Sequence, residues 1–233
     1  MKTIVITGTS SGLGKAFFDI FTSKYYCLVC LSRRFLDYQL ELARENNSIK
    51  LITQDLTDIN TLKHTLKTLD EIIPENTTQL IFISNAGIVD PIGKPGTLKE
   101  EDIIQSLSVN LTAPLLISNK ILEIHHKLKT KTIIINISSG AAERTIEGWE
   151  IYCTTKAGAK MFFDCTDDHY ENDDTVKIYN VNPGVMDTHM QDRIRQASEE
   201  EFPQVDRYRK LKENDQLNSP ESTADNIIDM CNI

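Results

Sequence analysis

The sequence predicts a single α/β domain built on a doubly wound parallel sheet with helices on both faces. Short, almost continuously apolar runs alternate with longer segments in which apolar residues recur at helical spacing. Strands covered on both faces by crossover helices have this composition, whereas antiparallel strands usually alternate apolar and polar residues. A glycine-rich turn directly after the first run supports the same prediction, because Rossmann-type dinucleotide-binding domains begin in this way.

Six segments are predicted to be strands, separated by helices in a repeated strand–helix order. The predicted strands are residues 3–7, 27–31, 49–53, 80–84, 132–138 and 176–182. Residues 57–73 are predicted to form a helix, because Leu62, Leu66 and Leu69 recur at intervals of three and four residues. Thr57 and Asp58 supply the capping chemistry expected at its start. No repeat or linker divides the chain, so residues 1–233 are predicted to form one domain.

The composition and net charge exclude several classes of function. With 233 residues and 40% hydrophobic content, the chain can bury a large core. Its net charge of −9 argues against binding to nucleic acid or to an anionic membrane, which attract basic surfaces. No apolar run approaches the ~20 residues that span a bilayer. The first residues run directly into a strand pattern without a leader, so we expect a cytoplasmic protein.

The five cysteines are scattered and odd in number, which does not indicate a disulfide framework. Cys27 and Cys30 have the spacing of redox or metal-binding pairs. Residues three apart on a strand point to opposite faces, however, so we interpret both as buried thiols of the core. The histidines have no metal-ligand spacing either, and we predict no metal.

The turn between the first strand and the following helix is the predicted pyrophosphate site. Its three glycines let the backbone approach a ligand closely, and the helix N-terminus adds amide donors and a positive dipole end. An ordinary glycine turn is the alternative, but its position between a strand and a helix argues against it. The predicted contacts are Gly8, Ser10, Ser11, Gly12, Leu13 and Gly14.

The ends of the next strands complete the predicted cofactor cleft. Where many dinucleotide folds have an acid that binds the ribose 2′-hydroxyl, this chain has Ser32, Arg33 and Arg34. Guanidinium groups pair with a 2′-phosphate, so we predict NADPH/NADP+ as the cofactor. The alternative interpretation for one of the two arginines is that it only covers the protein surface. The third and fourth strands contribute the remaining predicted contacts, Asp55, Leu56, Asn85, Ala86 and Gly87.

Ser139, Tyr152 and Lys156 are the predicted catalytic residues. On a helix, Tyr152 and Lys156 are one turn apart and share a face. Carbonyl reduction needs an acid for the developing alkoxide, and a phenol with a pKa near ~10 is poorly matched to neutral pH. The lysine ammonium, together with the positive nicotinamide of the oxidised cofactor, is expected to lower that pKa. Ser139 can donate a hydrogen bond to the carbonyl oxygen.

These motifs together resemble the short-chain dehydrogenase/reductase family over nearly the whole chain. The matching residues are Thr7, Gly8, Gly12, Gly14, Asn85, Ala86, Gly87, Ser139 rather than Ser138, Tyr152 and Lys156. The resemblance implies that Asn110 is a fourth catalytic residue, which kinks a helix and supports a water linked to the lysine. It also implies further cofactor contacts at Asn110, Tyr152, Lys156, Pro183, Gly184, Val185 and Thr188.

A narrower resemblance concerns residues 135–141, 148–149, 152–158 and 183–191. These segments are similar to those of bacterial benzil reductases that form (S)-benzoin, a group itself similar to sepiapterin reductases. Sepiapterin reductases hold the pterin with an acid on the last strand of the family. This sequence ends after a helix predicted to begin near Pro220, so that final edge strand is expected to be missing or truncated. A pterin substrate is correspondingly less favoured.

The predicted substrate contacts flank the catalytic and nicotinamide segments. They are Ser139, Gly140, Trp149, Tyr152, Met186 and Met190. An apolar, partly aromatic lining suits an aryl ketone or a vicinal diketone. For Trp149, helix packing or a subunit contact is an equal alternative to substrate contact. For both methionines, the alternative to substrate contact is packing in the core. Residues 185–218 are strongly charged and are predicted to be a substrate-side lid of short helices, with a solvated face as the alternative.

The predicted function is therefore NADPH-dependent reduction of an aromatic or vicinal diketone such as benzil to a hydroxyketone. Alternatives are a sepiapterin-type pterin reductase, a 3-oxoacyl carrier-protein reductase, and a non-enzymatic NADP-sensing regulator. The acidic residues 199–201 argue against docking of an acidic carrier protein. By family resemblance, helices near residues 114–129 and 152–170 are expected to form a homodimer interface.

Overall fold

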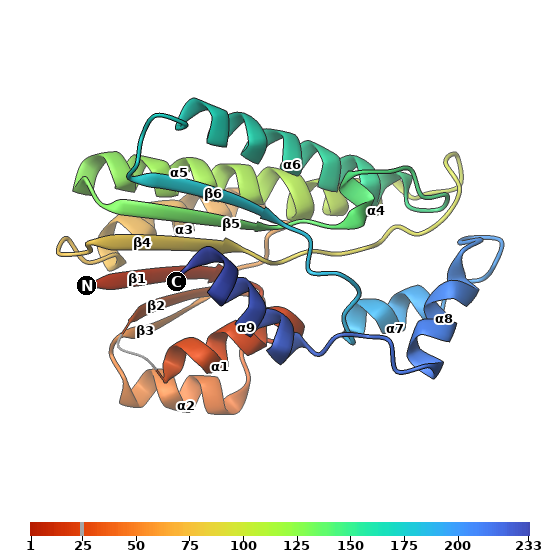
Figure 1. Ribbon diagram of the computed structural model, residues 1–233, viewed down its shortest axis with the longest axis horizontal. Coiled ribbons are helices and arrows are strands. Elements are labelled where there is room, and N and C mark those ends of the chain that lie inside the picture. The colour runs from red at the N-terminus through yellow and green to blue at the C-terminus, as the bar shows by residue number, and fades with distance from the viewer. Residues whose placement is uncertain (24–25) are drawn as a thin grey trace.

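Six parallel strands form a single sheet in the order β3-β2-β1-β4-β5-β6, with helices on both faces (Figure 1). The structure is a computed structural model, and it describes residues 1–23 and 26–233. The strands are β1 (Lys2–Thr7), β2 (Cys27–Ser32), β3 (Ile49–Thr53), β4 (Gln79–Ser84), β5 (Lys131–Ile137) and β6 (Val176–Val181). Each begins and ends within one residue of its predicted position, which confirms the doubly wound α/β fold.

Helices connect the strands and continue beyond the sheet. They are α1 (Gly12–Thr22), α2 (Asp37–Glu45), α3 (Ile59–Ile72), α4 (Glu100–Leu107), α5 (Ala113–Leu128), α6 (Glu150–His169), α7 (His189–Arg195), α8 (Val205–Glu213) and α9 (Pro220–Cys231). The helix predicted at residues 57–73 is α3. Its N-cap is Asp58, whose carboxylate accepts hydrogen bonds from the backbone N–H groups of Asn60 and Thr61.

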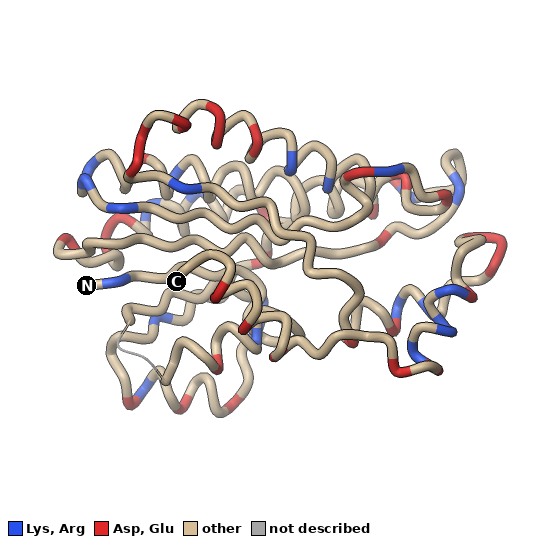
Figure 2. Tube along the Cα trace, in the orientation of Figure 1, with Lys and Arg blue, Asp and Glu red and all other residues tan. Residues whose placement is uncertain are grey.

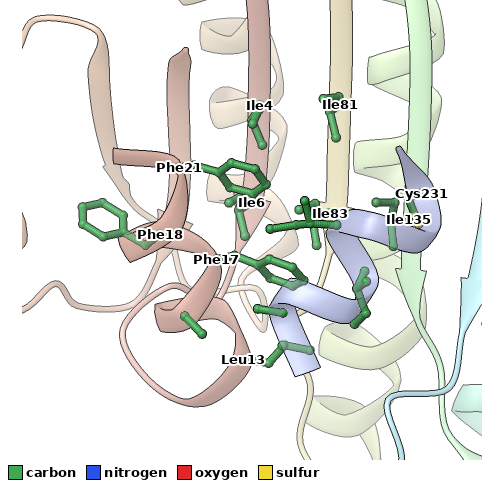
Figure 3. Close-up of a cluster of buried hydrophobic side chains, with 14 of the residues drawn as sticks. Ile4, Ile6, Leu13, Phe17, Phe18, Phe21, Ile81, Ile83, Ile135 and Cys231 are labelled. Carbon is green, nitrogen blue, oxygen red and sulfur yellow. The ribbon is translucent and has the colours of Figure 1, made fainter. Parts of the chain in front are cut away.

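One face of the sheet is covered by α1 and α9. Figure 3 shows Phe17 and Phe21 of α1 lying over Ile6 and Ile83 of the central strands, with Cys231 of α9 closing the other side. The side chains of Phe17 and Phe21 stack with ring centroids 6.2 Å apart. Both rings are almost completely buried, so this face depends on aromatic packing from a single helix.

The opposite face is covered by α3, α5 and α6. Leu69, Ile117 and Phe163 of these helices are fully buried in the cluster that contains Phe82 of β4. Because both faces are covered, the strands are apolar on both sides, as their sequences indicate.

The two cysteines of β2 lie on opposite faces of the sheet, as predicted. Cys30 belongs to the α1 side and Cys27 to the α3 side. Burial raises the pKa of the Cys30 thiol to about 12 and also raises the pKa of Cys27. Both are therefore inert core thiols rather than a redox or metal-binding pair.

The strand order reverses between β1 and β4. From β1 the chain builds outward through β2 to β3 on one side, and through β4 and β5 to β6 on the other. The connections leaving the carboxyl ends of β1 and β4 therefore diverge, which opens a crevice between them. No strand follows α9 in the part of the chain that the structure describes, so β6 is an edge strand, as the sequence predicts.

Two features of residues 1–23 and 26–233 concern membranes and metals. None of their helices combines the length and the apolar character needed to cross a membrane. These residues also hold no cluster of three or more His, Cys, Asp or Glu side chains arranged to bind a metal ion.

We expect Phe17→Ala to reduce the free energy of unfolding by about 3–5 kcal/mol, because it leaves a cavity between α1 and the sheet. Urea denaturation measures the change. Met230→Ala is the matched control on α9, since this side chain is 53% exposed and its loss should change stability by about 0.5 kcal/mol or less. Equal losses for the two variants would contradict the packing described here.

Candidate functional site

A cleft of about 930 Å³ runs along the carboxyl ends of the strands. It brings together nearly all the residues predicted from the sequence to bind cofactor or substrate. These are Gly8, Ser10, Ser11, Gly12, Leu13, Ser32, Arg33, Arg34, Asp55, Leu56, Asn85, Ala86, Gly87, Ser139, Gly140, Trp149, Tyr152, Lys156, Pro183, Gly184, Val185, Met186, Thr188 and Met190. Gly14 and Asn110 do not line the cleft, and both lie behind its wall.

The turn from β1 to α1 requires its glycines. Gly8 and Gly12 have φ angles of 76° and 52°, which favour glycine. A Cβ on Gly14 would lie 2.1 Å from the Gly8 carbonyl oxygen, a distance that no side chain tolerates. Gly14 is therefore needed for the close packing of helix against strand, rather than for a ligand contact of its own.

The N-terminus of α1 opens into this cleft. Its N-cap, Ser11, makes no side-chain capping hydrogen bond, and the first turn contains no acid. The first N–H groups of a helix have no partners within the helix, and they carry the positive end of the dipole. This end of the cleft therefore fits a phosphate or pyrophosphate group.

Hydrogen bonds between Thr7 and Asn85 join the ends of β1 and β4. The Thr7 hydroxyl accepts hydrogen bonds from the backbone N–H groups of Asn85 and Ala86, both at 3.0 Å. The Asn85 side-chain amide donates to the carbonyl oxygens of Thr7, at 2.9 Å, and Gly8, at 3.2 Å. Asn85 thus fixes the crevice and the glycine turn at once.

At the end of β2, the two arginines and Ser32 differ in surroundings. Ser32 is only 4% exposed, and its hydroxyl accepts a hydrogen bond of 2.7 Å from the backbone N–H of Thr9. Ser32 lines the cleft, but its hydroxyl already holds the glycine turn through this hydrogen bond. Arg33 and Arg34 are exposed and have no acidic partner among the described residues, so their charges are available to a ligand.

At the other end of the cleft, Tyr152 and Lys156 lie on the first two turns of α6, and Ser139 follows β5. The Lys156 ammonium donates a hydrogen bond of 2.9 Å to the Ile137 carbonyl oxygen and lies 5.9 Å from the centroid of the Tyr152 ring. The Ser139 hydroxyl accepts a hydrogen bond from the backbone N–H of Ala141 at 3.1 Å. The structure thus brings the three side chains predicted to be catalytic into one wall.

Burial controls the ionisation of Tyr152 and Lys156. It raises the pKa of Tyr152 to about 12, and the nearby Ser139 opposes this rise. It lowers the pKa of Lys156 to about 8, because a buried ammonium loses its hydration. In the protein by itself Tyr152 is therefore a neutral phenol at neutral pH. The predicted lowering of its pKa by Lys156 together with a positive nicotinamide remains a prediction.

Asn110 lies in a π-helical turn, Ser108–Thr112, that joins α4 and α5. Its side chain accepts from the Ile88 backbone N–H at 2.9 Å and donates to the Ile88 carbonyl at 2.7 Å. A Cβ on Gly87 would lie 3.3 Å from the Asn110 Oδ1 atom and 3.7 Å from the Lys156 Nζ atom. The distorted helix thus carries Asn110 to the rear of the Lys156 site, in agreement with the predicted kink.

Residues 185–218 follow β6, and the end of this segment returns to its beginning. Backbone hydrogen bonds of 3.0 Å join Asn218 to Val185 and to Asp187, so the two ends of the segment are paired. Thr188 contacts the glycine turn, since a Cβ on Gly12 would lie 3.2 Å from its methyl group. Helices α7 and α8 extend from this base beyond the sheet (Figure 1), and side chains of both line the cleft.

Trp149 both lines the cleft and packs inside the protein, so neither sequence interpretation excludes the other. Its ring is 4% exposed and stacks on Phe202 with centroids 4.7 Å apart. It also lies 5.4 Å from the rings of both Tyr152 and Tyr208. Gly148 is required here, because a Cβ would lie 2.3 Å from the Glu201 carbonyl oxygen. Met186 and Met190 are half-buried and also contribute to both core and cleft.

Several cleft residues were not predicted from the sequence, including a group on α7 and α8. The polar ones near the Trp149 end include Arg144, Gln191, Arg193, Arg207 and Tyr208. The spacing of Phe202, Val205 and Tyr208 is the signal that could have found Tyr208, because residues three apart share a helix face. Arg193 and Arg207 carry no comparable signal, since they are indistinguishable from the other charges of residues 185–218. Arg144 carries none either, since it stands among acidic residues between β5 and α6.

The fold and the cleft together define an α/β dinucleotide-binding protein with a polar wall that carries Ser139, Tyr152 and Lys156. A family model described as "short chain dehydrogenase" matches residues 2–199. The chain therefore belongs to the short chain dehydrogenase family, whose fold binds a nicotinamide cofactor, and it is an oxidoreductase acting on CH–OH or C=O groups. The uncapped α1 and the close glycine turn fit such a cofactor.

Individual relatives agree with this assignment. The chain is 36% identical over 227 residues to a benzil reductase ((S)-benzoin forming) of Bacillus cereus, covering 96% of this chain and 91% of the relative. A protein of the same name from Bacillus subtilis (strain 168) is 32% identical over 235 residues, covering 99% and 93%. Among solved structures, the KRED1-Pglu enzyme has a TM-score of 0.81 at 22% identity, covering 99% of this chain and 95% of that chain.

We expect the burial of Lys156 to make stability depend on pH. Its ammonium loses its proton near pH 8 in the folded protein, against an ordinary value of 10.5 in the unfolded chain. Between these values the unfolded chain binds more protons, so the free energy of unfolding rises with pH. Urea denaturation at pH 7 and pH 9.5 should show the unsubstituted protein gaining about 1–2 kcal/mol relative to Lys156→Met. A constant difference between the two proteins would contradict the depressed pKa.

Proposed function

We propose that the protein is an NADPH-dependent carbonyl reductase that acts on aromatic or vicinal diketones such as benzil. The observation that carries the proposal is the convergence of Ser139, Tyr152 and Lys156 on one wall of a dinucleotide-binding cleft. When bound, NADPH supplies a hydride to the carbonyl carbon, which reduces the ketone to an alcohol and leaves NADP+.

Tyr152 is the general acid of the proposed reaction. Its phenolic proton passes to the carbonyl oxygen as negative charge develops there. The raised pKa keeps this proton on Tyr152 at neutral pH until the alkoxide forms. Ser139 donates a hydrogen bond to the same oxygen and thereby holds the carbonyl beside the phenol.

Lys156 and Asn110 support Tyr152. The Lys156 ammonium stabilises the phenolate that remains after proton transfer, because an opposite charge nearby favours the ionised form. Asn110 positions a water molecule that returns a proton to the site through Lys156. Its position next to Gly87, with Lys156 on the same side, supports this role.

The proposed cofactor contacts follow the cleft from end to end. The pyrophosphate would be held by the β1–α1 turn and the N-terminus of α1, and the adenosine by Asp55, Leu56 and residues 85–87. Residues 183–185 and Thr188 would hold the nicotinamide. Arg33 and Arg34 would bind the 2′-phosphate, which NADH lacks, and their lack of acidic partners supports the choice of NADPH.

The proposed substrate class rests on the relatives and on the lining of the cleft. Both Bacillus relatives are named benzil reductases. Trp149, Tyr208, Val185, Met186 and Met190 provide an aromatic and apolar wall that suits the rings of a diaryl diketone. We propose that residues 185–218 act as the lid that carries part of this wall over the substrate.

The proposed setting is a cytoplasmic homodimer. All five cysteines are free, which suits a reducing compartment. Met161 on α6 is 62% exposed, and so is Ile104 on the neighbouring α4. Exposed large apolar side chains on this face of the molecule support an interface that includes α6.

We expect Tyr152→Phe to lower kcat for benzil reduction by about 10²–10⁴-fold, because the proton donor is lost while the ring remains. NADPH oxidation followed by absorbance measures the rate. NADPH binding, followed by fluorescence titration, should be nearly unchanged in this variant. Turnover within threefold of the unsubstituted enzyme would exclude Tyr152 as the acid.

We expect the double substitution Arg33→Gln and Arg34→Gln to lower kcat/KM for NADPH by about 10–100-fold, because hydrogen bonds between charged groups are lost. Catalytic efficiency with NADH should change much less. Arg44→Gln is the matched control, since this arginine lies on α2 outside the cleft. A protein that already prefers NADH would contradict the proposed cofactor.

A further inference from the structure

The arginines of this chain divide into neutralised and uncompensated groups. Of eight arginines, three form ion pairs, and these are Arg193 with Asp90, Arg195 with Asp192 and Arg209 with Asp206. The other five have no acidic partner within residues 1–23 and 26–233. Four of those five line the cleft, namely Arg33, Arg34, Arg144 and Arg207. Arginines without an ion pair are therefore concentrated in the cleft of a protein whose net charge is −9.

The four cleft arginines form two separate pairs. Arg33 and Arg34 follow β2, whereas Arg144 lies just beyond β5 and Arg207 is on α8. Strands β2 and β5 are separated by β1 and β4 in the sheet. At about 4.8 Å per strand spacing, β2 and β5 are about 14 Å apart. Arg33 and Arg34 follow the strand at which we propose that the 2′-phosphate binds, so Arg144 and Arg207 are available to a different ligand group.

Arg144 and Arg207 are both close to Tyr208. The Arg207 guanidinium carbon lies 5.9 Å from the centroid of the Tyr208 ring. Burial raises the pKa of Tyr208, and the positive charges of Arg207 and Arg144 oppose the rise, so both reach this phenol. The Tyr208 hydroxyl itself makes no hydrogen bond within the described chain. Two guanidinium groups without an ion pair and a phenol without a hydrogen-bond partner among the described residues thus line the same cleft.

Nearby acids do not neutralise this group of donors. Asp90 also lines the cleft, but its carboxylate accepts a hydrogen bond of 2.9 Å from Arg193. Asp102, on the first turn of α4, lines the cleft as well and forms no ion pair with Arg144 or Arg207 among the described residues. Figure 2 shows that basic and acidic residues are interspersed along α7 and α8. Among the described residues, Arg207 and Lys210 are the basic residues of these two helices that form no ion pair, and of these two Arg207 lines the cleft.

We propose that Arg144, Arg207 and Tyr208 bind a carboxylate of the substrate, so that the preferred substrates are ketones carrying a carboxylate group. The proposal rests on the proposed carbonyl reductase function and narrows its substrate class. The Trp149 ring lies 5.4 Å from both Tyr152 and Tyr208, so one aromatic ring separates the carbonyl-binding wall from the carboxylate site. An aryl ketone with a carboxylate on the far side of its ring matches this arrangement, since a carboxylate accepts from guanidinium and phenol donors.

The test compares 4-carboxybenzil with benzil, both reduced with NADPH. We expect kcat/KM to be at least tenfold higher for 4-carboxybenzil, mainly through a lower KM. The ratio of the two values should fall as sodium chloride is raised, because salt screens exposed charges. A ratio of one or less in the unsubstituted enzyme would overturn the carboxylate site.

Substitutions test whether Arg144, Arg207 and Tyr208 cause the preference for 4-carboxybenzil. The double substitution Arg144→Gln and Arg207→Gln should bring the ratio close to one, and Tyr208→Phe should lower it partway. Lys210→Gln is the matched control, because Lys210 is an exposed cation on the same helix that does not line the cleft. It should leave the ratio unchanged. A tenfold ratio that persists in the double variant, or that Lys210→Gln abolishes equally, would overturn the assignment to these residues.

The two levels of the proposal fail in different ways. If neither diketone is reduced, the proposed function itself is wrong. If benzil is reduced and the ratio does not respond to salt or to the arginine substitutions, only the carboxylate site is wrong. The salt dependence is measured on the unsubstituted enzyme, so this arm remains decisive even if the double variant does not fold.

Discussion

The hydrogen bonds between Thr7 and Asn85 are the constraint on which the rest of the site depends. They join the ends of β1 and β4, the two strands between which the strand order reverses. They also hold the glycine turn through the Gly8 carbonyl. They tie the glycine turn before α1 to β4, the neighbour of the strand β5 that precedes Ser139. A short polar contact thus converts strand order into a ligand site.

The strands, and the shared position of Ser139, Tyr152 and Lys156 in one cleft, could be predicted because these features have strong local signals. Apolar strands, glycines with positive φ and the spacing of Tyr152 and Lys156 are visible without knowledge of distant contacts. The engagement of Ser32 with Thr9, by contrast, depends on residues 23 apart in the chain. Tyr208 and Arg207 lie in a charged segment, and only tertiary packing shows that one faces Trp149 while the other remains unpaired.

Burial shifts the pKa values of two neighbouring groups in this cleft in opposite directions. It disfavours charge on both Tyr152 and Lys156, and it therefore makes the phenol a weaker acid and the ammonium a stronger one. The four arginines that line the cleft without an ion pair are exposed, whereas Tyr152 and Lys156 are buried. The charges proposed to recognise a ligand are therefore exposed, and the proposed proton donor is buried.

The paired ends of residues 185–218 have an evolutionary consequence. Because Asn218 bonds back to Val185 and Asp187, the chain between them is an excursion from a fixed point of the framework. Beyond Thr188, which contacts the glycine turn, its length and sequence can change without moving any strand. Selection can therefore vary this excursion as a cassette, and new specificities can arise while the half of the cleft formed by the strand ends stays the same.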